Sequence, residues 1–289
     1  MVVRFKSLDI RVSGEVLQSI KKYLRKAKKQ VTDGKPQNAE PKAAAEFTHA
    51  KMLDKAHTGL YAGILVFTGT VIAFIMFMYC IQSEDSAKQD EAILIYDVTD
   101  LGLCILAFVA ILLAVFKMRS FSYSLLRENY VDHFLLMISF CGLTLYELFQ
   151  VVCFFYNVTH KNVNTETILG AVSSLFTIIQ ALFQIAFILF GMQLYAHSSE
   201  QRANKPGRGI ITFLIIANLS FWVIKSFGEG DVSTDLMEAF FGITAWQIIL
   251  HVNLPFMLFF RFHSSVCLAD MWTSAYENEE SPIQYVDID

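Results

Sequence analysis

The run GLYAGILVFTGTVIAFIMFMYC, from Gly59 to Cys80, contains no charged residue. An apolar stretch of about 18 residues or more is long enough to cross the hydrocarbon core of a bilayer as a helix. The run lacks the strict apolar and polar alternation of a barrel strand. Because a membrane interior offers no water to backbone groups, such a run must form a helix whose amides bond to one another. It therefore predicts a transmembrane helix.

Five more apolar blocks follow along the chain. Only 17% of the residues are charged, whereas soluble domains carry about 25%. The blocks are too long and too uniformly apolar for the core helices of a soluble protein. The sequence predicts an all-α integral membrane protein with six transmembrane helices. They cover roughly residues 58–82, 101–117, 133–156, 168–195, 209–227 and 240–262.

The connections between the blocks alternate in charge. Residues 1–56 contain 13 Lys and Arg, and the connections 117–131 and 196–208 contain three each. The other connections contain at most one, and two of them, 83–100 and 228–239, contain six and four acids. Because Lys and Arg concentrate on the cytosolic side, both termini are predicted to be cytosolic. The sequon at Asn157 then falls on the outer side, where it is a glycosylation candidate.

The chain divides into four predicted segments. Residues 1–32 place apolar side chains on one helical face and basic ones on the rest. This pattern suits a basic amphipathic cytosolic helix on an anionic leaflet, or equally a solvated basic arm. Residues 33–56 have the composition of a linker. Residues 57–265 form the predicted six-helix domain, and residues 266–289 are predicted to be an acidic cytosolic tail.

Amide side chains recur at similar depth in the last three predicted helices. Gln180 and Gln184 are four residues apart and share one helical face. Asn218 and Asn253 lie near the middle of the next two blocks. Such groups either bond between helices, at about 0.6–2 kcal/mol per interaction, or line a polar pathway. The residues alone leave both interpretations open.

Glu147 and His251 are ionisable side chains at membrane depth. Burying such a group costs about 2.5–3.5 kcal/mol on insertion scales, so each marks a candidate functional site. A carboxyl and an imidazole can exchange protons, although a permanently bonded structural role is the alternative.

Three further residues of the last two blocks are expected to have local roles. Lys225 and Arg261 lie near the ends of their blocks and are predicted to extend to the interface. Pro255 lacks a backbone donor and is predicted to kink its helix beside His251.

The last block ends in a sequence that resembles a known family. AWQIILHVNLPFMLFFRFHSSVCLADMWTSAY, from Ala245 to Tyr276, is similar to the end of the last membrane helix of the otopetrin proton channels. Its most specific part is Arg261-Phe262-His263-Ser264-Ser265. The stretches KAHTGLYAGIL (55–65), IQALFQIAFIL (179–189) and NLSFW (218–222) are similar to earlier helices of that family's second half.

The resemblance implies an architecture and a site. Otopetrins have two six-helix halves in one chain and assemble as dimers, and this chain is similar to the second half only. The family places a Gln, an Asn and a Tyr on the last three helices of each half. Gln184 and Asn218 match, whereas Phe260 stands where the Tyr is common. The acid that often follows the NLSFW-type helix is displaced from Gly228 to Glu229.

The resemblance also implies a function. It indicates a proton channel that carries H+ across the plasma membrane in response to extracellular acid. The expected proton pathway or gate consists of Glu147, Gln184, Asn218, His251 and Asn253, and the family motif includes Arg261, His263 and Ser264. Expected partners are protons, the lipid bilayer, and either further copies of the chain or a chain that supplies a first half. The missing half and Phe260 favour an alternative, a non-conducting otopetrin-derived subunit or assembly partner.

Other classes have little support in the sequence. It contains no HExxH, GxSxG or phosphate-binding P-loop motif, so neither an enzyme nor a cofactor is expected. The five cysteines form no CxxC pair and are expected to be buried thiols rather than metal ligands. No nucleic-acid partner is expected. An unrelated six-span transporter, receptor or membrane enzyme is the remaining alternative.

Overall fold

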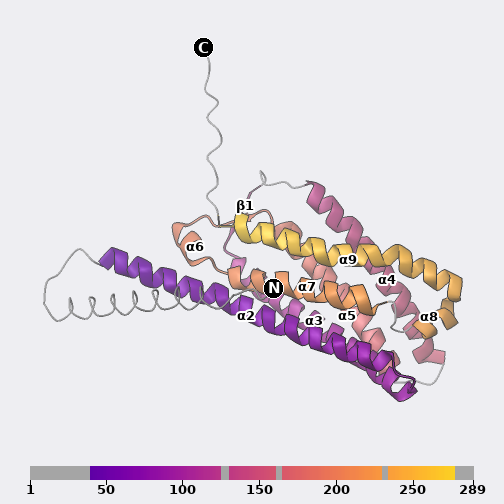
Figure 1. Ribbon diagram of the computed structural model, residues 1–289. Helices are drawn as coiled ribbons and strands as arrows, with labels where there is room; N and C mark the ends of the chain where they lie inside the picture. Colours follow the sequence, from indigo (N-terminus) through magenta and orange to yellow (C-terminus); the bar gives the residue numbers. More distant parts are fainter. Residues whose placement is uncertain (1–39, 125–129, 161–164, 230–233, 277–289) are drawn as a thin grey trace, which may run out of the picture. The chain divides into compact units, whose positions relative to one another are not determined.

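Helices make up nearly all of the chain that the structure describes. The computed structural model describes residues 40–124, 130–160, 165–229 and 234–276. Its elements are α2 (Glu40–Ile81), α3 (Ser86–Met118), β1 (Ser122–Tyr123), α4 (Tyr130–His160), α5 (Thr165–Gly191), β2 (Leu194–Tyr195), α6 (Ser199–Asn204), α7 (Arg208–Gly228), α8 (Thr234–Phe241) and α9 (Ile243–Ser274) (Figure 1). Within these residues, 6 helices are long and apolar enough to cross a membrane, namely α2, α3, α4, α5, α7 and α9. The predicted all-α membrane architecture is confirmed.

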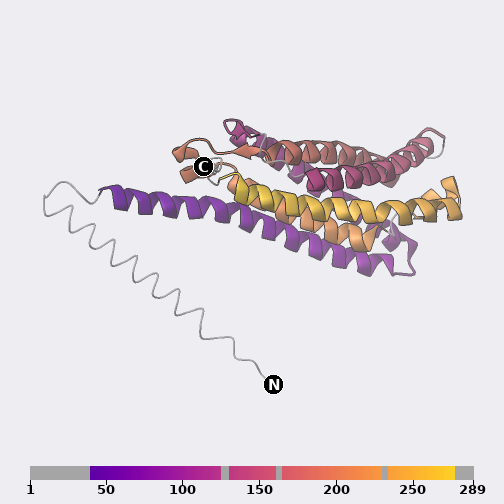
Figure 2. The same ribbon diagram turned by 90° about the horizontal axis from the view of Figure 1, so that it is seen from above.

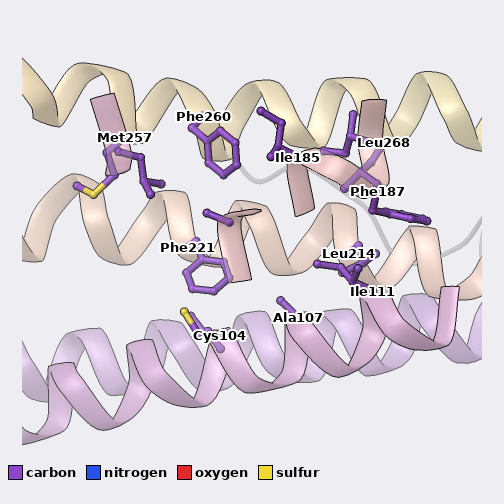
Figure 3. Close-up of a cluster of buried hydrophobic side chains, with 14 of the residues drawn as sticks. Cys104, Ala107, Ile111, Ile185, Phe187, Leu214, Phe221, Met257, Phe260 and Leu268 are labelled. Atoms are coloured by element: carbon purple, nitrogen blue, oxygen red, sulfur yellow. The ribbon is translucent and has the colours of Figure 1, made fainter. Parts of the chain in front are cut away.

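Five of these helices close a ring. α3 packs on α5 and α7, α4 packs on α5 and α9, and α7 packs on α9. Each of the five therefore packs on at least two others, and the cycle returns to its start. Both ribbon views show α9 alongside α7 (Figures 1 and 2). In the close-up, Cys104 of α3, Phe221 of α7 and Phe260 of α9 point into the space that the helices share (Figure 3).

Glycines bring α2 close to α7. A Cβ atom added at Gly59 would lie 1.8 Å from the carbonyl oxygen of Gly209. At Gly63 it would lie 2.7 Å from Cδ1 of Ile216. The two helix backbones therefore approach one another more closely than any larger residue would allow.

Two segments predicted to lie outside the spans are helical. Residues 40–56, the second part of the predicted linker 33–56, belong to α2. Its alanine run 43–45 favours a helix, and Pro41 is tolerated in a first turn. The predicted tail 266–289 begins with residues 266–274 of α9, and Cys267 is buried there. Residues 1–32 and 277–289, with their predicted basic helix and acidic tail, lie outside the described residues.

α3 extends well beyond the predicted span 101–117. Asp85 caps its N-terminus by accepting a hydrogen bond from the Ala87 amide at 3.1 Å. Most of the predicted outer connection 83–100 is therefore helix. The acids in this stretch interrupt the apolar run, but Asp97 and Asp100 are buried inside the protein.

The connections at one end of the ring are tied together. β1 and β2 pair as antiparallel strands. The Ala196 amide donates to the Ala275 carbonyl at 2.8 Å, and the Tyr276 hydroxyl donates to the Pro206 carbonyl at 2.8 Å. The residues directly after α9 are thus bonded to the segment that joins α5 and α7.

Candidate functional site

A polar pocket lies between α3, α4, α5 and α7. Its ionisable lining consists of Tyr96, Asp97, Asp100, Glu147, Lys225 and Glu229. Four carboxyl groups thus share one space with a single ammonium group. Of this set the sequence had singled out only Glu147 as a site residue.

Lys225 forms two ion pairs in the pocket. Its Nζ atom lies 3.2 Å from Oδ2 of Asp100 and 3.0 Å from Oε2 of Glu229. All three side chains are buried. The prediction that Lys225 extends to the membrane interface is therefore wrong. Two carboxylates within reach compensate the cost of burying its charge.

Hydrogen bonds from two other helices hold Glu229. The Tyr96 hydroxyl of α3 donates to its Oε2 atom. Nε2 of Gln150, on α4, donates to Oε1 at 3.0 Å. Ser174 of α5 in turn donates to Oε1 of Gln150 at 2.9 Å. Both carboxylate oxygens of Glu229 are thus fixed in place.

Glu147 enters the same pocket from α4 and is less constrained. Its side chain is buried, with 2% of the residue exposed. Its Oε1 atom has no hydrogen-bond partner in the part of the chain that the structure describes. A buried carboxyl oxygen without a donor is available to accept a proton or a water molecule.

A second polar group, the amide layer, lies deeper in the ring and consists of Gln180, Gln184, Asn218 and Arg261. Nη1 of Arg261 donates to Oε1 of Gln180 at 2.7 Å. Nε2 of Gln180 donates to Oε1 of Gln184 at 2.8 Å, and Nε2 of Gln184 donates to Oδ1 of Asn218 at 2.6 Å. The predicted pair Gln184 and Asn218 is thus brought together across α5 and α7.

Short polar side chains connect the pocket to the amide layer. Ser173 donates to Oδ2 of Asp100 at 3.2 Å, and Cys104 Sγ lies 3.3 Å from the Thr177 hydroxyl. These contacts repeat at a spacing of four residues on both α3 and α5, so they follow one helix face. At about 1.5 Å per residue, the array from Glu229 to Asn218 extends about 16 Å along α7.

Arg261 is not at the interface, contrary to prediction. Its side chain is 0% exposed, and its guanidinium carbon lies 3.9 Å from the centroid of the Phe221 ring. The neighbouring motif residues His263 and Ser264 are also buried. His263 Nε2 lies 3.6 Å from a carboxylate oxygen of Asp132 on α4. These three motif residues are therefore buried within the protein, whereas Phe262 of the same motif is exposed.

Two predicted pathway residues of α9 do not join the array. His251 is exposed on the outer face of the ring, and its Nδ1 atom lies 2.7 Å from the Gln247 carbonyl of its own helix. Asn253 is buried but donates to the Ile249 carbonyl at 2.8 Å. Because polar residues occur on several sides of α9, their depth alone did not reveal which face they occupy. The helix itself runs through Pro255.

The glycosylation candidate Asn157 is also placed differently from the expectation. It lies within α4 and is buried, with 3% of the residue exposed. Its Nδ2 atom, which would carry a glycan, donates to the Cys153 carbonyl at 2.8 Å. In this arrangement the amide is not available for modification.

The site residues that the sequence analysis missed had one usable signal. Lys225 and Glu229 are four residues apart, a spacing that places opposite charges on one helical face. Asp100 and Cys104 have the same spacing on α3. The contacts that join these pairs across α3 and α7 can be seen only in the folded structure.

Known proteins resemble most of this chain. Residues 13–262 match the family model described as otopetrin. The Drosophila melanogaster protein named Proton channel OtopLc is 33% identical over 226 residues, which are 77% of this chain and 14% of that protein. Proton channel OTOP1 of Rattus norvegicus is 32% identical over 66 residues, covering 22% of this chain and 11% of that protein. The chain thus spans a small part of the length of these relatives.

Proposed function

Because this chain belongs to the otopetrin family, we propose that it forms a proton-conducting domain. It would carry H+ across the plasma membrane in response to extracellular acid. Relatives bear the name proton channel. The observation that carries the proposal is the buried array of polar side chains from Glu229 to Asn218, in which three bonded groups follow one another along the helices.

The charge of the connections supports an orientation. With both termini in the cytosol, α7 runs from the cytosol to the outside. Glu229 then lies at the outer end of α7, and the pocket is the part of the array closest to external acid. The proton would enter at the pocket and leave beyond the amide layer.

The pocket is suited to receiving protons. Carboxyl groups gain and lose protons readily, and Glu147 presents an oxygen without a donor. Lys225 compensates part of the negative charge of Asp100 and Glu229, so the pocket remains stable when it is dehydrated. Protonation of either carboxylate weakens its attraction to Lys225, which couples acid to the arrangement of the ion pairs.

The contacts below the pocket support onward transfer. Ser173, Thr177 and Cys104 each have a side chain that can donate and accept. Water molecules between such groups would complete a hydrogen-bonded route to the amide layer. We assign Gln184 and Asn218 to the narrow part of this route, and His251 to a face that meets lipid or another protein.

The family resemblance bears on assembly. Because it implies that two six-helix halves work together, we propose that conduction requires a second six-helix half, supplied by another copy of this chain or by a partner. The exposed His251 is a polar group on an otherwise apolar face. Because a polar side chain is unfavourable in lipid, His251 favours a protein neighbour at this face.

The alternative is a non-conducting otopetrin-derived subunit. It is favoured by Phe260, which is buried and packs on Phe140 with 6.0 Å between ring centroids. No hydroxyl is supplied at this position, which the family resemblance associates with a Tyr. A subunit of this kind would associate with a longer otopetrin and leave conduction to it.

Whole-cell recording tests the proposal. Cells with the chain at their surface should show inward current when external pH is lowered, and Glu147→Gln should reduce it at least about tenfold. Glu84→Gln changes an exposed acid outside the array and is the matched control. Absence of current with confirmed surface expression would contradict conduction. Co-purification with a full-length otopetrin would then select the alternative.

A further inference from the structure

We propose that Arg261 makes the amide layer reject alkali cations, by fixing the direction of its hydrogen bonds and by its positive charge. The inference rests on the proposed function, because it treats the layer as the narrow part of the proton route. It concerns what the layer excludes, which neither family membership nor the pocket determines.

The donor chemistry of Arg261 sets the orientation of the layer. A guanidinium has only donors, so Gln180 must turn its carbonyl oxygen toward Arg261. The amide nitrogen of Gln180 then faces Gln184, and that of Gln184 faces Asn218. One residue at the start of the series thus decides which way each following amide points.

In this orientation every side-chain oxygen of the amide layer already accepts a hydrogen bond. Oε1 of Gln180 accepts from Arg261 at 2.7 Å, and Oε1 of Gln184 accepts from Gln180 at 2.8 Å. Oδ1 of Asn218 accepts from Gln184 at 2.6 Å. An alkali ion can enter a dehydrated layer only if protein oxygens replace its water, and here each such oxygen already has a donor.

The positive charge of Arg261 also opposes the entry of alkali cations. Among the described residues, no carboxylate lies within ion-pair distance of its guanidinium. Its Nε and Nη2 atoms are buried and have no hydrogen-bond partner in those residues. The flat face lies over the Phe221 ring. A desolvated positive charge repels a metal cation at close range much more strongly than it would in water.

A proton differs from an alkali ion in what it needs. It moves along hydrogen bonds and requires no shell of coordinating oxygens. The positive charge opposes an excess proton as well. Removal of Arg261 should therefore let alkali cations pass through the layer without reducing proton flux.

The experiment uses the purified chain in liposomes, with separate dyes for H+ and K+ flux. Arg261→Gln removes the charge, and because an amide can donate or accept, it no longer forces the oxygen of Gln180 toward position 261. We expect K+ flux to rise at least about tenfold above the wild-type protein. Arg261→Lys keeps a positive donor and should keep K+ out. Equal K+ leakage through both variants, or none through folded Arg261→Gln, would overturn the proposal.

The two assays separate this inference from the proposed function. H+ flux through the wild type without K+ leakage in Arg261→Gln supports the function and refutes the inference. K+ leakage through Arg261→Gln, together with no H+ flux through the wild type, supports the inference and refutes the proposed function. If Arg261→Gln does not fold, Arg261→His replaces it, because its charge can be set by pH. K+ should then leak at pH 8.5 and not at pH 5, which lie about 2 units above and about 1.5 units below the ordinary imidazole pKa, and equal flux at the two pH values overturns the proposal.

Discussion

Asp100 of α3 and Lys225 of α7 form an ion pair inside the ring, with 3.2 Å between Oδ2 and Nζ. Both side chains are 4% exposed, and Glu229 completes the group from the end of α7. The pair therefore ties two neighbouring helices of the ring at the outer part of the polar array. Its removal should affect both stability and proton transfer.

Lys225→Met should lower the free energy of unfolding by about 3–5 kcal/mol, because it leaves two buried carboxylates without a counter-charge. Thermal or denaturant unfolding in detergent would measure the loss. Lys88→Met, at an exposed lysine, is the control and should change little. Adding Glu229→Gln to the first variant should recover part of the stability. An unchanged midpoint for Lys225→Met would show that the ion pairs do not stabilise the fold.

The bond between Gln184 and Asn218 should appear as a coupling energy. A double-mutant cycle with Gln184→Leu and Asn218→Leu compares each single variant with the pair. Interhelical hydrogen bonds in membrane proteins contribute about 0.6–1.7 kcal/mol, and we expect a coupling in that range. Additive effects of the two substitutions would mean that the 2.6 Å contact contributes nothing measurable.

Phe260→Tyr tests the departure from the family resemblance. The new hydroxyl would be buried, and the guanidinium carbon of Arg261 lies 5.7 Å from the ring centroid. We expect larger acid-evoked currents than in the wild type, because the hydroxyl adds a donor and an acceptor to the route. Phe262→Tyr changes an exposed Phe two positions along α9 and should leave the current unchanged. Equal currents in all three proteins would refute a role for this position.

Two glycines of α2 give a matched test of helix packing. Gly59→Ala should reduce stability by about 2 kcal/mol or more, because its Cβ would meet the Gly209 carbonyl. Gly69→Ala has nothing within 4 Å and should be neutral, or stabilise α2 by up to about 1 kcal/mol. Unfolding of the two variants in the same detergent provides the comparison. A tolerated Gly59→Ala would indicate that α2 is not held against α7.

His251→Phe should change acid-evoked current by less than about twofold, since exposed positions rarely affect a buried site. Glu147→Gln, recorded in parallel, shows the effect of a pocket residue. A strong loss of acid-evoked current in His251→Phe would show that this histidine belongs to the pathway. It would also place a proton route on the outer face of α9.

Much of the fold was predictable because lipid imposes simple requirements. Long apolar runs must be helical, and Gln180, Gln184 and Asn218 were placed together correctly by depth and by spacing on α5. The failures occurred where depth is insufficient. His251 and Arg261 lie on one helix, yet the exposed residue was expected inside and the buried one at the interface. Their faces depend on how α9 is rotated against α4 and α7, which its sequence does not encode locally.

Charged residues near the ends of spans posed a related problem. Asp100 and Glu229 were counted with the acidic connections because acids usually mark the end of a membrane helix. Their burial depends on Lys225, and the three residues come from two helices that are far apart in sequence. Only the packing of α3 on α7 shows that Lys225 compensates both carboxylates.

The bond between Tyr276 and the Pro206 carbonyl has a practical consequence for producing the protein. Hydropathy suggests that a recombinant fragment could stop at Ser265, where the apolar block gives way to polar residues. Such a fragment would lack the buried Leu268 and Met271 and the pairing of Ala275 with Ala196. A fluorescent or affinity tag should therefore follow Tyr276, so that the last helix keeps its attachment during extraction and purification.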